Sequence, residues 1–228
     1  MKTKLFFLIM MLAIAGLQCA AMTGKARNET TPGQGSPRRM VKGRVLTSAG
    51  FPSMQLRVNA PFRYLGSFSF TVPNMSSGER YAFAEVKGRR IKRLFILQFE
   101  AILPESTETY NYGFADALTI GGLKFKQNTF AFNAGDALKK SPPDEGALTT
   151  QFLRKKGYLS ENEIMAARLV NVPDAERKHE MILFYMENIG DTGHTLKDFY
   201  SGEERTPLWR ELSRGLAQRL VDSFTIIQ

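Results

Sequence analysis

The chain has 228 residues, of which 43% are hydrophobic, 11% aromatic and 23% charged, a composition that is typical of globular proteins and excludes a disordered or fibrous chain. The net charge of +9 is uneven, because residues 41–103 hold 10 basic and 3 acidic residues whereas residues 104–228 hold 15 basic and 18 acidic residues. This asymmetry predicts an electropositive surface built by the first half and argues against a uniformly basic nucleic-acid binder.

The N-terminus has the pattern of a removable export signal. Two lysines precede an unbroken apolar run, Leu5–Leu17, and small residues lead to a cleavage position after Ala21. A helix of that length rises about 20 Å, which is short of the roughly 30 Å hydrocarbon core, so we expect no stable membrane span. Residues 1–21 are therefore predicted to be a signal peptide, and the mature chain to begin at Met22 in the periplasm or outside the cell.

Cys19 offers an alternative to a soluble exported protein. An acylated cysteine would make the chain a lipoprotein, and the polar segment that follows would serve as its tether. Gln18 stands where a lipoprotein signal requires a small residue. Lipoprotein anchoring through Cys19 is therefore the less favoured localisation.

Residues 22–40 are rich in glycine, proline, threonine and serine and have no apolar period, which predicts a flexible linker. The remaining residues, 41–228, are long enough for one domain. No cysteine follows Cys19, so the exported domain has no internal disulfide and depends on its core for stability.

The first half of this domain has the patterns of β-strands. Hydrophobic residues alternate with polar ones over Met54–Val58 and Phe68–Val72, as in strands with one exposed face. Tyr81–Val86 and Ile91–Leu103 flank a short basic sequence with Gly88 at its centre, which predicts a hairpin. The second arm is apolar on both faces, as expected of a strand in the middle of a sheet.

Strands are also predicted in the second half. Leu118–Phe130 reads as a strand interrupted at Gly121-Gly122, and Ala166–Val172 and Lys178–Asn188 flank a loop that contains proline and aspartate. The last of these segments is again apolar on both faces. We therefore expect it to be a second central strand.

Two short helical segments are predicted between these strands. Asp144 is a suitable N-cap, and Gly157 is a suitable C-terminal stop after three basic residues. Ser160 and Glu163 match a capping box, which predicts a further helical turn there.

The C-terminal helix is the most strongly marked element. Thr206 and Pro207 form a cap and first turn, and the apolar stripe that reaches to about Asp222 consists of Trp209, Leu212, Leu216 and Leu220. We therefore predict an α+β fold, in which a long C-terminal helix packs across a curved antiparallel β-sheet of about seven strands, with one or two short helices. The 17 phenylalanines and 10 methionines suggest an apolar or amphiphilic ligand between sheet and helix, although the same residues also suit a filled core.

Five cations lie within seven residues around the predicted hairpin tip: Lys87, Arg89, Arg90, Lys92 and Arg93. Such a tip is suited to contact lipid phosphates, lipopolysaccharide or an acidic partner. The alternative is a solvated hairpin that uses charge to stay unpaired. Nucleic acid is not an expected partner, because the segment lacks interleaved stacking aromatics and the chain carries an export signal.

The most enzyme-like segment follows the last predicted strand. Glu187, Asp191 and His194 lie on a glycine-flanked stretch, where His194 would act as a general base oriented by either carboxylate. No nucleophile motif accompanies them, and the two histidines of the chain without a nearby cysteine predict neither a metal nor a cofactor. A non-enzymatic exported binding or interaction protein is the favoured hypothesis, and a small hydrolase-like enzyme that uses His194 is the alternative.

Overall fold

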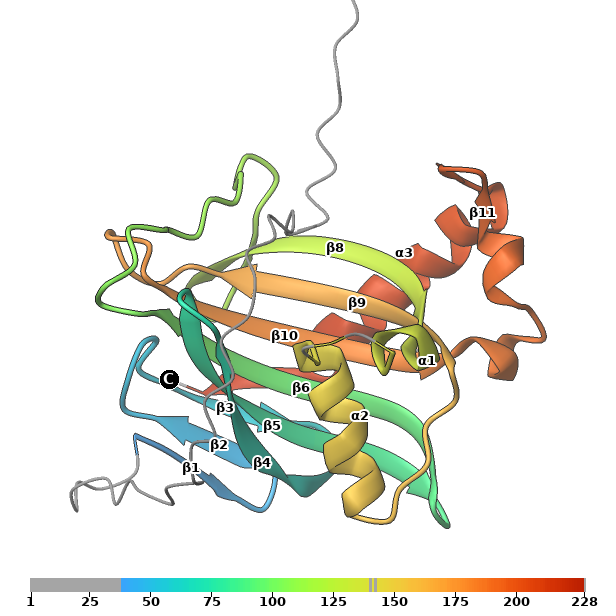
Figure 1. Ribbon diagram of the computed structural model, residues 1–228, viewed down its shortest axis with the longest axis horizontal. Helices are drawn as coiled ribbons and strands as arrows, with labels where there is room; N and C mark the ends of the chain where they lie inside the picture. Colours follow the sequence, from blue (N-terminus) through green and yellow to red (C-terminus); the bar gives the residue numbers. More distant parts are fainter. Residues whose placement is uncertain (1–37, 140, 142, 228) are drawn as a thin grey trace, which may run out of the picture. The chain divides into compact units, whose positions relative to one another are not determined.

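Seven antiparallel strands form the larger of two main sheets in the computed structural model, which describes residues 38–139, 141 and 143–227. The predicted signal peptide and all but the end of the predicted linker lie outside the described residues. The strands of this sheet, in spatial order, are β4 (Arg63–Val72), β5 (Ser76–Lys87), β6 (Arg90–Ile102), β10 (His179–Asn188), β9 (Glu163–Asn171), β8 (Leu123–Asn133) and β7 (Leu118–Ile120). The two strands predicted to be central, β6 and β10, are adjacent in the middle of the sheet (Figure 1).

A second sheet of four strands was not predicted as a separate layer. Its strands, in order, are β1 (Arg39–Lys42), β2 (Val45–Ser48), β3 (Met54–Val58) and β13 (Phe224–Ile227). β1 begins inside the segment predicted as linker, where Arg39 pairs with Ser48. β13 is the last strand of this sheet, where it pairs with β3, a strand that is far away in sequence. A two-stranded pair, β11 (Tyr200–Ser201) and β12 (Glu204–Arg205), precedes the last helix.

The helices are α1 (Ala134–Ala137), α2 (Glu145–Lys155) and α3 (Pro207–Asp222), with 3-10 turns η1 (Ile189–Thr192) and η2 (Leu196–Phe199). Two predicted N-caps are confirmed: the Asp144 side chain accepts from the Ala147 amide, and the Thr206 side chain accepts from the Trp209 amide. The predicted helical turn at Ser160 is wrong, because Glu163 begins β9 and pairs with Asn133 of β8. Pairing along both edges of β9 outweighs the local capping signal.

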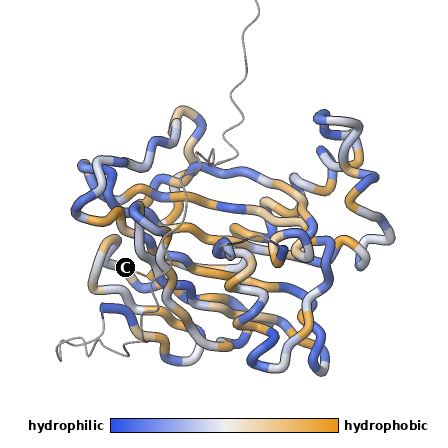
Figure 2. The backbone as a smooth tube through the Cα atoms, viewed as in Figure 1, coloured by the Kyte–Doolittle hydropathy of each residue, from blue (hydrophilic) through white to orange (hydrophobic). Residues whose placement is uncertain are grey.

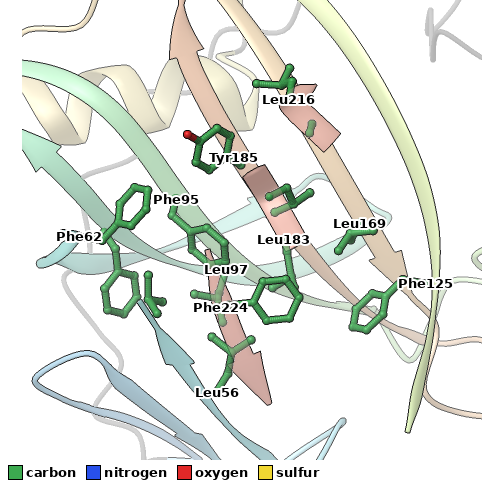
Figure 3. Packing of buried hydrophobic residues seen from close by; sticks show 14 of the residues in the cluster. Leu56, Phe62, Phe95, Leu97, Phe125, Leu169, Leu183, Tyr185, Leu216 and Phe224 are labelled. Atoms are coloured by element: carbon green, nitrogen blue, oxygen red, sulfur yellow. The ribbon is translucent and has the colours of Figure 1, made fainter. Parts of the chain in front are cut away.

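One face of the large sheet is covered by the four-stranded sheet and α3. The predicted stripe of α3 does point inward, since Trp209, Leu216 and Leu220 have no exposed surface. They join Leu56 of the small sheet and Phe95 of the large sheet in one hydrophobic cluster. Figure 3 shows Leu56, Phe95 and Leu216 in this cluster. α3 contacts β8, β9 and β10 of this sheet, which confirms that the C-terminal helix packs on the sheet. The helix has 16 residues and covers only part of this face.

The opposite face of the large sheet is covered by α2. Leu153 and the half-buried Phe152 of α2 pack on the second hydrophobic cluster, which includes Ile96 and Ile182 of the two central strands. Because both faces are covered at the middle of the sheet, the central parts of these two strands are hydrophobic on both sides (Figure 2). This explains why their sequences do not alternate.

Candidate functional site

One end of the large sheet joins the β5–β6 hairpin to the segment that follows α2. Gly88 at the hairpin tip has a φ of +60°, a value that glycine adopts without steric cost. The Leu159 amide donates to the Arg89 carbonyl at 2.9 Å, and the Ile91 amide donates to the Leu159 carbonyl at 2.9 Å. These bonds fix the C-terminal end of α2 beside the hairpin tip.

This arrangement gathers cations from three separate parts of the sequence. We call the following exposed residues the basic end: Arg63, Lys87, Arg89, Arg154, Lys155 and Lys156. Within the described part of the chain, none of the six forms an ion pair with a carboxylate. Arg89 donates to the Gly157 carbonyl and Arg63 to the Tyr158 hydroxyl. Leu159 lies between these two segments with 53% of its surface exposed, an apolar side chain within a positively charged surface.

The five predicted anion-contacting residues have different surroundings. Arg90 pairs with Glu161 at 3.0 Å and with Asp191 at 2.8 Å, and Lys92 pairs with Asp191 at 2.8 Å. Arg93 pairs with Glu85, and this bond raises the pKa of Arg93. Only Lys87 and Arg89 of the predicted set therefore belong to the basic end.

The predicted catalytic residues are not assembled into a site. Asp191 is held by Lys92, Asn188 and Arg90, and these contacts, the bond from Lys92 first, lower the pKa of its carboxyl. Glu187 receives two hydrogen bonds from Arg219 of α3, at 2.8 and 2.9 Å.

His194 lies apart from both carboxylates. Its ring contacts Phe199 at a centroid distance of 6.4 Å, and no hydrogen bond joins it to Asp191 or Glu187 among the described residues. The geometry therefore does not supply the oriented base that the sequence pattern suggested.

Arg154, Lys155 and Lys156 were missed as candidate functional residues. In the sequence these residues are only the basic last turn of a helix. A run of three cations is a visible signal, but its position beside the hairpin tip depends on how α2 packs across β4 and β5, and no local pattern specifies that packing.

A second group of polar residues is buried between α2 and the middle of the sheet. Glu100 and Glu180 are directly opposite each other on β6 and β10, and they are 7% and 4% exposed. Glu100 accepts from Gln98 at 2.7 Å and from Ser76, and Glu180 accepts from the Tyr112 hydroxyl at 2.8 Å. Each glutamate interrupts or adjoins an apolar run of its strand, and this is the signal in the sequence that marks the pair.

Burial and proximity favour the neutral form of this glutamate pair. Burial raises the pKa of both carboxyl groups, and the neighbouring Glu100 contributes further to the shift of Glu180, whose pKa reaches about 8. Arg80 joins this group to α2, donating to Gln98 at 2.6 Å and to Thr149 at 2.6 Å. Burial lowers the pKa of Arg80 to about 10, so it stays charged at neutral pH. The network fixes α2 to the sheet through Arg80.

Two cavities accompany these features. One of about 60 Å³ lies between α2 and the sheet beside Arg80 and Leu153. The other, of about 280 Å³, lies at the end of β9 beside Asn171. α3 lines neither of these two cavities, and its inward side chains Trp209, Leu216 and Leu220 are buried in the hydrophobic cluster.

The described residues contain no group of three or more histidine, cysteine or acidic side chains placed to bind a metal ion. In the same part of the chain, no helix combines the length and apolarity needed to cross a membrane. Comparison with family models, with curated proteins and with solved structures found no match to this chain. Its function must therefore be argued from its own surfaces.

Proposed function

We propose that the chain is an exported, non-enzymatic protein that binds an anionic lipid surface through the basic end. The observation that carries the proposal is the concentration of six exposed cations, without carboxylate partners among the described residues, around the exposed Leu159. Each lysine or arginine near an anionic membrane contributes about 1 kcal/mol to binding. An apolar side chain among these cations adds contact with the acyl boundary.

The neighbouring ion pairs support this assignment. Arg90 pairs with Glu161 and Asp191, and Lys92 pairs with Asp191. These ion pairs hold the hairpin in place beside the basic end. The cations of the basic end have no carboxylate partner among the described residues, so their charge is available to phosphates. Since the hairpin and α2 are joined by backbone hydrogen bonds, little conformational entropy is lost when a flat surface binds.

Neutralising Lys87, Arg154, Lys155 and Lys156 to glutamine is expected to reduce binding to vesicles that contain phosphatidylglycerol. At about 1 kcal/mol per cation, the loss approaches roughly a thousandfold if the contributions add. Co-sedimentation of the mature chain with vesicles measures the effect. Replacing four other exposed cations, Lys42, Arg44, Lys197 and Arg214, changes the net charge equally and serves as the control. Equal losses in the two variants, or no binding by the parent, would contradict the proposal.

Export is a separate prediction, since the signal lies outside the described residues. N-terminal sequencing of the protein from its own host is expected to begin at Met22. Mass spectrometry that finds a fatty-acylated Cys19 would replace the soluble exported form with a lipoprotein. In that case the basic end would act close to the membrane that already anchors the chain.

A hydrolase that uses His194 is the weaker proposal. Both carboxylates that were expected to orient this histidine are held by cations instead. An amphiphile held between the sheet and α3 is also less favoured, because Trp209, Leu216 and Leu220 are fully buried in the hydrophobic cluster there.

A further inference from the structure

One edge of the large sheet is long and has no partner strand. β4 is the edge strand opposite β7 (Figure 1), and it pairs with β5 on one side only. On its other side, the described part of the chain forms no hydrogen bond with the backbone of residues 66–71. A row of unpaired N–H and C=O groups is a template on which another strand can pair.

The other three edges of the two main sheets are protected against such pairing. β7 has only three residues and β13 has four. β1 also has four residues, and it carries a cation at each end, Arg39 and Lys42. Short length and charge are two of the means by which natural proteins keep sheet edges unpaired.

β4 lacks this protection over most of its length. The strand has ten residues, and Arg63 at its start is the only charged one. A β-bulge interrupts its pairing with β5 near the start, but from Gly66 to Val72 the pairing is regular. The described part of the chain leaves one face of this regular segment uncovered, since the following side chains are exposed: Ser67, Ser69 and Thr71.

The N-terminal segment of the same chain is a poor occupant for this edge. Its sequence over residues 22–37 contains Pro32 and Pro37, which have no amide hydrogen to donate to a neighbouring strand. The longest run without proline or glycine, residues 25–31, holds three charged residues and no apolar side chain larger than that of Ala26. Such a run offers no cross-strand partner for the aromatic residues of β4.

A second copy of β4 matches the edge when the two strands run antiparallel. Ser69 is the midpoint of the regular segment, so a two-fold axis through Ser69 pairs the whole segment with itself. Phe68 then lies opposite Phe70 of the second copy on one face, and Ser67 lies opposite Thr71 on the other. Aromatic pairs and hydroxyl pairs stabilise neighbouring antiparallel strands.

The position of the basic end also favours the antiparallel arrangement. Arg63 begins β4, and the Lys156 side chain lies against Gly66, so the positive charge is concentrated at the start of the strand. Antiparallel pairing about Ser69 separates the two copies of Arg63 by about 40 Å along the strands. This is several times the screening length of about 8–10 Å, whereas parallel pairing would place the two basic ends side by side.

We propose that the chain forms a symmetric dimer in which β4 pairs with β4 of a second copy, so that the two large sheets become one continuous sheet. Because both copies use the same edge, the assembly closes after two chains and does not extend into a fibre. Dimerisation through β4 is independent of membrane binding through the basic end.

Sedimentation velocity of the mature chain tests the dimer. We expect the parent to be dimeric at about 100 μM. Ser69→Lys places two like charges opposite each other at the axis, and it should weaken dimerisation at least about tenfold. Thr119→Lys is the matched control, because Thr119 is exposed on β7 at the opposite edge of the same sheet, and it should stay within about twofold of the parent.

A single cysteine tests the register of the two strands. No cysteine follows Cys19, so Ser69→Cys supplies the only thiol of a mature chain that begins at Met22. Opposite residues of antiparallel strands have Cα atoms about 4.5–5.5 Å apart, a distance that a disulfide spans. Mild oxidation should therefore cross-link Ser69→Cys into a covalent dimer and leave Thr119→Cys largely monomeric.

Three results would overturn the proposal: a parent that is monomeric at about 100 μM, equal effects of the two lysine variants, or equal cross-linking of the two cysteine variants. Protection of the β4 amides from hydrogen exchange that is independent of protein concentration would also contradict it, because the edge would then be covered within one chain. If Ser69→Lys fails to fold, Ser69→Cys decides, since it replaces a single atom. The variant with four neutralised cations in the basic end should dimerise as the parent does.

Discussion

Replacing Leu216 by alanine is expected to lower the free energy of unfolding by about 2–5 kcal/mol, a large share of the roughly 5–15 kcal/mol that a domain of this size has in total. Leu216 has no exposed surface and sits in the cluster that joins α3 to both sheets (Figure 3). Truncation removes buried apolar contacts and leaves a cavity in this cluster, and both effects contribute to the expected loss.

Urea denaturation of the two proteins measures this loss. Leu118→Ala is the matched control, because Leu118 lies on the edge strand β7 with 38% of its surface exposed, and its removal should cost well under half as much. A Leu216→Ala variant as stable as the parent would show that α3 is not part of the core. Such a result would instead favour an amphipathic helix that binds a membrane.

The stability of the chain is expected to fall as pH rises from about 5 to about 9 because of the buried Glu180. Its pKa in the folded protein, about 8, lies above the ordinary value of 4.5, so the folded state binds the proton more tightly than the unfolded chain. The stabilisation from this proton is complete below the ordinary pKa and is lost as the pH passes through the folded value. The shift corresponds to a change of order 3–5 kcal/mol.

Glu180→Gln keeps the shape and the neutral charge of the protonated residue. We expect this variant to match the parent within about 1 kcal/mol at pH 5 and to be the more stable protein at pH 9. Glu105→Gln, at an exposed position, should leave the pH dependence of the parent intact. Thermal melts across this pH range compare the three proteins, and parallel profiles for Glu180→Gln and its parent would refute the raised pKa of Glu180.

Local signals in the sequence were sufficient for several elements. The N-caps Asp144 and Thr206, the glycine of the β5–β6 hairpin and the stripe of α3 act within a few residues, so their physical basis is visible in a short window. The two-sided hydrophobicity of β6 and β10 also indicated correctly that these strands lie in the middle of a covered sheet. These elements needed no knowledge of the tertiary structure.

Features that depend on contacts between distant residues could not be predicted. The four-stranded sheet forms because β13, at the C-terminus, pairs with β3, and no local pattern specifies that partner. At Ser160 the local capping signal was misleading, since pairing of β9 with β8 and β10 buries a whole strand and outweighs one helical cap. Partner choice is a property of the folded chain and not of a short segment.

The features of the candidate sites also fall into those that local sequence specifies and those that depend on contacts between distant residues. The sequence by itself determined the charge asymmetry, the cations of the hairpin and the absence of familiar catalytic motifs. Only the tertiary structure brought Arg154–Lys156 to the hairpin, tied Asp191 and Glu187 to cations, and placed Glu100 opposite Glu180. The physical reason is that a side chain's charge is encoded locally, whereas its partners and its burial are set by strand register and by the packing of α2 and α3 across the sheet.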